Sequence, residues 1–303
     1  MLRSFLLKLS NSPGFRRWVT SNSLTRRMAR RFVAGETLDE AVAAARVCNH
    51  AGMLTSLDYL GENVASTADA QRARDAYLEV FDRIEKEKLL ANVSCKLTQL
   101  GLDLSAEFCE GQVFSIVERA ASYNNFLRVD MEGSLYTQRT VSLVKRVRGR
   151  NPCVGTVIQS CLYRSENDVR DLLAYGCRIR LCKGAYKESA DVAFAKKRDV
   201  DGNYIRLMRM LLTSNVYHAI ATHDPRMIGQ TIRWAAAKNV AKDAFEFQML
   251  YGVRTDLQRK LVHGGYRVRV YIPYGLDWFP YFMRRLAERP ANLAFFARNL
   301  LRS

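Results

Sequence analysis

The chain has 303 residues, of which 48% are hydrophobic and 25% charged, a composition typical of a globular protein with one large core. It holds no run of 18 or more uncharged apolar residues, which excludes a transmembrane span on sequence grounds. The formal net charge of +17 predicts an anionic partner, which could be a membrane surface, a nucleic acid or a phosphorylated ligand.

The first 35 residues form a basic segment with eight arginine or lysine residues and no acidic residue. Within it Leu2, Phe5, Leu6 and Leu9 fall on one face of a helix, and charged and polar residues fall elsewhere. Two interpretations stay open: a helix that lies on anionic lipid, and a helix that packs on the rest of the protein. An Arg- and Ser-rich segment without acids also leaves mitochondrial targeting open.

Eight short apolar or β-branched runs then recur along the chain, and most of the gaps between them show helical periodicity. Residues 37–50 open with T-L-D-E, and residues 67–88 carry acids among alanines and leucines, as exposed helices do. The runs predict strands at residues 54–64, 92–100, 126–131, 156–162, 178–186, 216–222, 245–250 and 268–272. Strands that alternate with helices predict the α/β class, here a (β/α)₈ TIM-type barrel. No linker divides residues 1–303, so one domain is expected.

Some familiar sites are disfavoured. No G-x-G-x-x-G or G-x-x-x-x-G-K-[ST] motif is present, which argues against a Rossmann or P-loop nucleotide site. The seven cysteines are scattered and form no C-x-x-C pair, so we expect reduced thiols in a cytoplasmic protein, and no metal site.

The last predicted helix begins after Asp277 and should cross the barrel mouth. Tyr281, Arg284, Arg285 and Glu288 share one of its faces at i, i+3, i+4 and i+7. Two guanidinium groups on one face can bind a carboxylate in bidentate fashion, and an amino-acid substrate presents such a carboxylate.

Polar and charged residues also collect at the predicted strand ends, where the active site of a (β/α)₈ barrel lies. Lys96 and Asp130, on neighbouring strands, are expected to pair beneath a ligand. Arg180 and Lys183 place two cations where a flavin or a phosphate could bind. The strand-end residues are Glu62, Lys96, Asp130, Glu132, Gln159, Arg180, Lys183, Thr222 and His223.

Together these segments resemble the proline dehydrogenase family, both its stand-alone bacterial enzymes and the dehydrogenase domain of its bifunctional members. The resemblance runs from about residue 32 to residue 292. The motifs that carry it are L-G-E-N (60–63), S-C-K-L-T-Q-L-G (94–101), V-D-M-E (129–132), R-L-C-K-G-A-Y (180–186), A-T-H-D (221–224), F-E-F-Q-M-L-Y-G (245–252), Y-I-P-Y-G (271–275) and Y-F-M-R-R-L-A-E (281–288).

The resemblance implies oxidation of L-proline to Δ1-pyrroline-5-carboxylate, the first step of proline catabolism to glutamate. A hydride would pass from proline C5 to N5 of a noncovalently bound FAD, and the electrons would pass to a membrane quinone. The product would be handed to pyrroline-5-carboxylate dehydrogenase. It also implies a cytoplasmic protein held peripherally on the inner face of the cytoplasmic membrane, which gives the basic segment at residues 1–35 a purpose.

The resemblance also assigns roles by position. Catalytic positions are Lys96, Asp130, Tyr271, Arg284 and Arg285. Substrate-binding positions add Glu62, Tyr186, Leu250, Tyr281 and Glu288, with Arg284 and Arg285 on the proline carboxylate and Glu62 paired with Arg284. Cofactor-binding positions are Gln159, Arg180, Lys183, Gly184, Thr222 and His223.

Two alternatives compete with this interpretation. A Schiff-base aldolase would use a lysine at a strand end, and Lys96 and Lys183 are available. Nucleic-acid binding would explain the net charge, but no recognised motif or basic-aromatic patch accompanies it, so no nucleic-acid partner is expected.

Overall fold

The computed structural model describes residues 14, 17, 19, 23–186 and 188–288 of the chain. In these residues eight parallel strands close into a barrel: each strand pairs with the next along the chain, and β8 returns to β1. The strands are β1 (Leu54–Tyr59), β2 (Ala91–Cys95), β3 (Leu127–Val129), β4 (Val154–Gln159), β5 (Arg178–Cys182), β6 (His218–Ala221), β7 (Phe245–Leu250) and β8 (Arg267–Tyr274). The TIM-type barrel predicted from the sequence is confirmed.

Several strands end before the apolar runs that predict them. β1 ends at Tyr59 and β5 at Cys182. Beyond these ends, Asn63 (φ 53°) and Gly184 (φ 116°) adopt positive φ torsions that a strand does not use. After β2 the chain turns into the short 3₁₀ helix η1 (Thr98–Leu100). These early exits convert predicted strand ends into the loops at the barrel mouth.

One helix follows each strand, and two further helices precede β1. The helices after the strands are α5 (Thr67–Lys86), α6 (Ala106–Ser122), α7 (Ser134–Arg150), α8 (Ser165–Ala174), α9 (Lys197–Leu212), α10 (Pro225–Ala237), α11 (Thr255–His263) and α12 (Trp278–Glu288). The two that precede β1 are α3 (Ser23–Ala29) and α4 (Leu38–His50). The T-L-D-E motif forms a capping box in which Thr37 and Glu40 each bind the other's backbone N–H.

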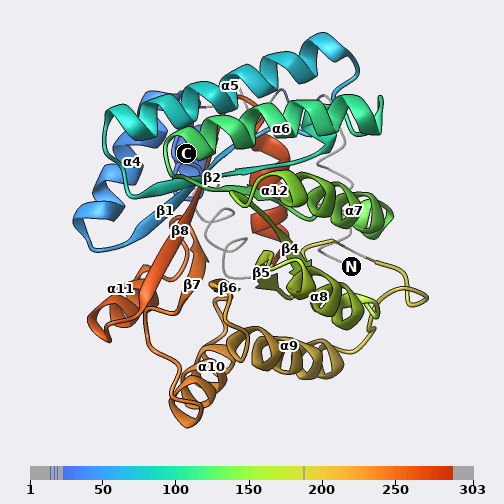
Figure 1. Ribbon diagram of the computed structural model, residues 1–303. Helices are drawn as coiled ribbons and strands as arrows, with labels where there is room; N and C mark the ends of the chain where they lie inside the picture. The colour runs from blue at the N-terminus through green and yellow to red at the C-terminus, as the bar shows by residue number, and fades with distance from the viewer. Residues whose placement is uncertain (1–13, 15–16, 18, 20–22, 187, 289–303) are drawn as a thin grey trace.

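Helix α4 occupies the position beside β8 where the last helix of a regular barrel would lie. It contacts both β8 and β1, so it fills the wall position that the helix after the last strand would otherwise take. Figure 1 shows α4 to α11 following one another around the barrel, with α12 inside that ring. The sequence expectation of a C-terminal helix over the mouth is confirmed.

The buried apolar side chains fall into two clusters. The larger one joins the strands to the surrounding helices and includes Tyr77, Phe81 and Phe247. The smaller one, here called the cap cluster, joins α12 to the chain that precedes α4. Its members are Val19, Ala29, Phe32, Val33, Leu60, Trp278, Phe279, Tyr281, Phe282, Met283 and Leu286.

The basic N-terminal segment is described only in part. Val19 and Phe32 are buried, so these two residues of the segment pack on the protein. The apolar face formed by Leu2, Phe5, Leu6 and Leu9 lies outside the described residues. Among the described residues, none of the helices combines the length and the apolar character that crossing a bilayer requires.

Candidate active site

A cavity of about 700 Å³ opens at the carboxyl ends of the strands, a volume suited to a cofactor or a drug-sized ligand. Strands β4 to β8, the loops after β2 and β3 and helix α12 all contribute side chains to its lining. Fourteen of the sixteen site residues predicted from the sequence line it: Lys96, Asp130, Gln159, Arg180, Lys183, Gly184, Tyr186, Thr222, His223, Leu250, Tyr271, Tyr281, Arg284 and Arg285.

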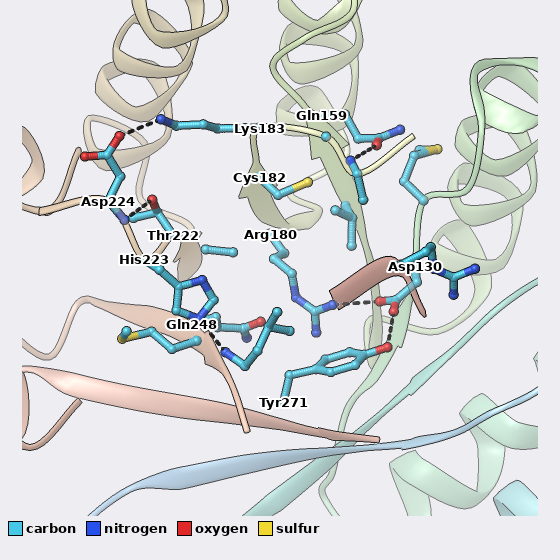
Figure 2. A pocket seen from close by; sticks show the side chains of 18 of the residues that line it. Asp130, Gln159, Arg180, Cys182, Lys183, Thr222, His223, Asp224, Gln248 and Tyr271 are labelled. Atoms are coloured by element: carbon cyan, nitrogen blue, oxygen red, sulfur yellow. Dashed lines mark hydrogen bonds and ion pairs between the residues drawn. The ribbon is translucent and has the colours of Figure 1, made fainter. Parts of the chain in front are cut away.

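Asp130 is the centre of a buried polar cluster on one side of the cavity. Its two carboxylate oxygens accept hydrogen bonds from Arg180 Nη1 and Tyr271 Oη, each at 2.7 Å. Figure 2 shows Arg180 and Tyr271 both pointing at Asp130. The guanidinium of Arg180 also donates to Ser94 Oγ at 2.8 Å and lies 5.2 Å from the centre of the Tyr271 ring. These contacts fix Arg180 in one orientation at the cavity wall.

Lys96 does not pair with Asp130, and that expectation is wrong. Its Nζ lies 3.1 Å and 3.2 Å from the two carboxylate oxygens of Asp58, which is fully buried in β1. Burial alone would lower the pKa of Lys96, but the carboxylates of Asp58 and Asp130 outweigh burial and raise it. Lys96 therefore stays protonated. Asp58 has one sequence signal: with Ser56 it places polar side chains at alternate positions of an otherwise apolar strand.

Lys183 forms part of a charged network on the opposite side. Its Nζ lies 2.6 Å from Asp201 and 2.7 Å from Asp224, and Lys197 also contacts Asp201. Figure 2 shows Lys183 reaching Asp224. Burial would raise the pKa of Asp224, but the hydrogen bond from Lys183 lowers it. Asp201 was not predicted as a site residue, because it lies inside α9 and no local sequence pattern marks it.

Two residues after β6 shape the loops beside the cavity. His223 Nε2 accepts the backbone N–H of Leu250 at 2.9 Å, so this nitrogen carries no proton in the structure. Thr222 Oγ1 accepts the backbone N–H of Asp224 at 3.0 Å.

Gly184 allows the chain after β5 to pack closely against Cys161. A Cβ at this position would lie 2.4 Å from Cys161 Sγ, and its φ of 116° is one that side chains rarely adopt. Only a glycine fits here, and its backbone forms part of the cavity wall.

Helix α12 brings two arginines over the cavity. Arg284 forms a two-point ion pair with Glu62, at 2.7 Å and 3.3 Å, as the resemblance predicts. Arg285 is buried, and its guanidinium lies 5.1 Å from the centre of the Tyr281 ring. Glu62 itself is not part of the lining and acts on the cavity through Arg284. The side chain of Glu288, the last residue of α12, lies outside the described residues.

The cavity suits an anionic ligand with polar edges. Its lining carries seven basic side chains and only two carboxylates, Asp130 and Asp224. Among the described residues, Arg180 Nε, a donor, and Gln248 Oε1, an acceptor, are buried atoms of the lining that have no hydrogen-bond partner. Buried polar atoms are normally paired, so a bound ligand would satisfy them. Gln248 was not predicted as a site residue, although it stands two residues before Leu250 on the inward face of β7.

Comparison with known proteins identifies the family. The family model described as proline dehydrogenase matches residues 41–298. The chain is 41% identical over 302 residues to proline dehydrogenase 1 of Bacillus subtilis (strain 168), covering 100% of both chains. It is 40% identical over 280 residues to proline dehydrogenase of Deinococcus radiodurans, covering 91% of this chain and 90% of that one.

A solved structure gives the same answer for the fold. Proline utilization A (PutA) of Bdellovibrio bacteriovorus superposes with a TM-score of 0.82 at 26% identity. The match covers 87% of this chain and 33% of that longer one. The family model and the full-length relatives lead to one conclusion: the chain belongs to the proline dehydrogenase family.

Proposed function

We propose that this protein oxidises L-proline to Δ1-pyrroline-5-carboxylate with a noncovalently bound FAD and passes the electrons to a membrane quinone. The observation that carries the proposal is the position of Arg284 and Arg285 on α12, which face the Asp130–Arg180–Tyr271 cluster across one cavity. The arginines assigned to the carboxylate and the residues assigned to the cofactor thus line one cavity.

The α12 arginines are assigned to the proline carboxylate. Arg285 offers a guanidinium in a buried site, where a charge-assisted bond is stronger than in water. Glu62 orients Arg284, because the two-point ion pair holds the Arg284 guanidinium in one orientation. Tyr281 supports Arg285 by stacking, while Tyr186 and Leu250 would enclose the ring.

The strand-end wall of the cavity is assigned to a flavin. Arg180 offers an unpaired buried donor, Gly184 leaves the backbone open, and Lys183 supplies positive charge. The residues that would hold the cofactor are Gln159, Arg180, Lys183, Gly184, Thr222 and His223. When bound, the flavin would accept a hydride equivalent from proline C5 at its N5 and later release the electrons to the quinone.

The protein's own groups would prepare the substrate. The cations of Lys96, Arg284 and Arg285 favour the neutral form of the proline amine, because a nearby positive charge and burial both lower the pKa of an ammonium. The neutral nitrogen has the lone pair that assists loss of hydride from C5. Holding the carboxylate fixed also orients C5, which reduces the entropy lost on reaching the transition state.

The aldolase alternative is weakened by the same geometry. A Schiff-base lysine must be deprotonated to attack a carbonyl, whereas Asp58 and Asp130 hold Lys96 protonated. Burial would lower the pKa of Lys183, but its ion pairs with Asp201 and Asp224 raise it. Neither lysine is poised as a nucleophile.

Location and partners form part of the proposal. A quinone dissolved in the bilayer requires that the protein approach the inner face of the cytoplasmic membrane, and the basic segment at residues 1–35 would be attracted to its anionic surface. The product would then be available to a pyrroline-5-carboxylate dehydrogenase.

Turnover with a water-soluble quinone tests the proposal. Purified protein supplied with FAD, L-proline and the quinone should reduce the quinone and form one Δ1-pyrroline-5-carboxylate for each quinone consumed. Borohydride added with candidate aldol substrates should leave the protein's mass unchanged. A borohydride-trapped adduct on Lys96 or Lys183, without quinone reduction, would show that the aldolase hypothesis is correct.

A further inference from the structure

Helix α12 does not rest on the barrel's own core. All six of its buried apolar side chains that the structure describes belong to the cap cluster, and none belongs to the larger cluster of the barrel. The helix has only 11 residues, a length that is marginally stable without packing partners. The position of α12 therefore depends on the cap-cluster side chains that come from other parts of the chain.

That contribution comes mainly from the chain before α4. Phe32 is 2% exposed, and its ring lies 6.3 Å from that of Phe282. Trp278, at the start of α12, packs edge-on against Phe282 at 5.9 Å and donates from Nε1 to Glu36 at 3.0 Å. An aromatic contact and a hydrogen bond thus join residues 32–36 to the first two turns of α12.

The same segment is tied to the barrel. The backbone N–H of Ala34 donates to Pro273 O at 2.9 Å, and that of Gly275 donates to Gly35 O at 3.0 Å. The carbonyl of Arg31 lies so close to Gly252 that a Cβ there would fall 1.7 Å from it. Residues 31–35 are therefore fixed against the ends of β7 and β8.

We propose that the N-terminal segment around Phe32 is a positioning element for the carboxylate-binding arginines. It is fastened to the barrel on one side and supports α12 on the other, so it sets the distance of Arg284 and Arg285 from the strand-end residues. Phe32 is not itself a lining residue of the cavity or a member of the barrel core cluster, and its ring packs against Phe282. The inference rests on the proposed binding of the proline carboxylate by these arginines.

Replacing Phe32 by alanine tests the idea. The space left beneath Phe282 should let α12 shift, so the KM for proline should rise roughly tenfold or more, since a displacement of about 1 Å at a positioned group costs up to two orders of magnitude. The kcat at saturating proline should stay within about twofold, because the groups beside the cofactor are untouched. Phe32→Leu, which keeps most of the volume, should recover most of the loss.

Two inhibitors distinguish a displacement of the carboxylate-binding arginines from a general loss of structure. Cyclopentanecarboxylate carries the carboxylate without the amine, and pyrrolidine carries the amine without the carboxylate. In Phe32→Ala the inhibition constant of cyclopentanecarboxylate should rise in parallel with KM, while that of pyrrolidine stays constant. Hydrogen exchange should quicken in residues 278–288 and remain slow in the strands.

A matched control is Phe81→Ala, because Phe81 is equally buried but belongs to the barrel core. It should lower the melting temperature and leave the KM for proline unchanged. If wild-type protein oxidises proline and Phe32→Ala keeps the wild-type KM, the positioning role is wrong and the proposed function stands. If Phe32→Ala does not fold, Phe32→Val decides, because valine also leaves part of the space empty: a raised KM for proline is expected, and a wild-type KM would overturn the inference. Absence of proline oxidation in the wild type would instead refute the proposed function.

Discussion

Arg285→Ala is expected to raise the KM for proline roughly ten- to a hundredfold while the protein keeps its flavin. A charge-assisted hydrogen bond to a carboxylate contributes about 1.5 to 3 kcal/mol, and every 1.4 kcal/mol is a tenfold change in affinity. Most of the loss should sit in KM, because the contact with the carboxylate itself is made in the ground state as well as in the transition state. Steady-state kinetics at saturating quinone would measure it.

Arg285→Lys is the informative companion. Lysine keeps the charge but lacks the planar fork and the stacking on Tyr281, so it should restore only part of the affinity. Bound flavin, followed by its absorbance after gel filtration, should be equal in all three proteins. A KM for Arg285→Ala equal to that of the wild type would remove this residue from the carboxylate site.

Lys96→Met should have the largest effect on stability, lowering the free energy of unfolding by about 3 to 5 kcal/mol. It leaves the fully buried carboxylate of Asp58 without its cation, and breaking a buried pair costs about that much. The double variant Asp58→Asn with Lys96→Met removes both charges and should regain much of the loss. Urea unfolding of the three proteins, each saturated with FAD, would measure the differences.

The deficit of Lys96→Met should depend on pH. Burial raises the pKa of Asp58, and Lys96 opposes that rise, so removing Lys96 lets the pKa rise further. The folded protein then holds a proton that the unfolded chain releases above about pH 4. Stability relative to the wild type should therefore fall as the pH increases from that value, and the deficit should shrink in acid. A deficit that is constant across this range, or a double variant as unstable as the single one, would show that the pair does not act as described.

Features encoded locally could be predicted from the sequence. Each barrel strand is a buried apolar run, so all eight appeared in the correct order, and the capping motif before Leu38 marked the start of α4 correctly. The residues at the strand ends could also be identified, because parallel strands in a closed barrel bring their carboxyl ends to one face. The composition of the mouth was thus predictable.

Features that depend on pairing across the fold were not predictable. Lys96 could have paired with an acid on either neighbouring strand, and only the three-dimensional register selects Asp58 over Asp130. Asp201 reaches Lys183 from α9, far along the chain. The contact between Phe32 and Phe282 joins opposite ends of the sequence, and no local pattern reports it.

The central claim is that this protein uses a flavin to oxidise proline, and one measurement tests it most directly: the visible absorption spectrum before and after anaerobic addition of L-proline. The account predicts a flavin band in the purified or FAD-reconstituted protein, bleached by L-proline and restored by a quinone. A protein that binds no FAD, or a flavin band that proline leaves unchanged, would contradict it.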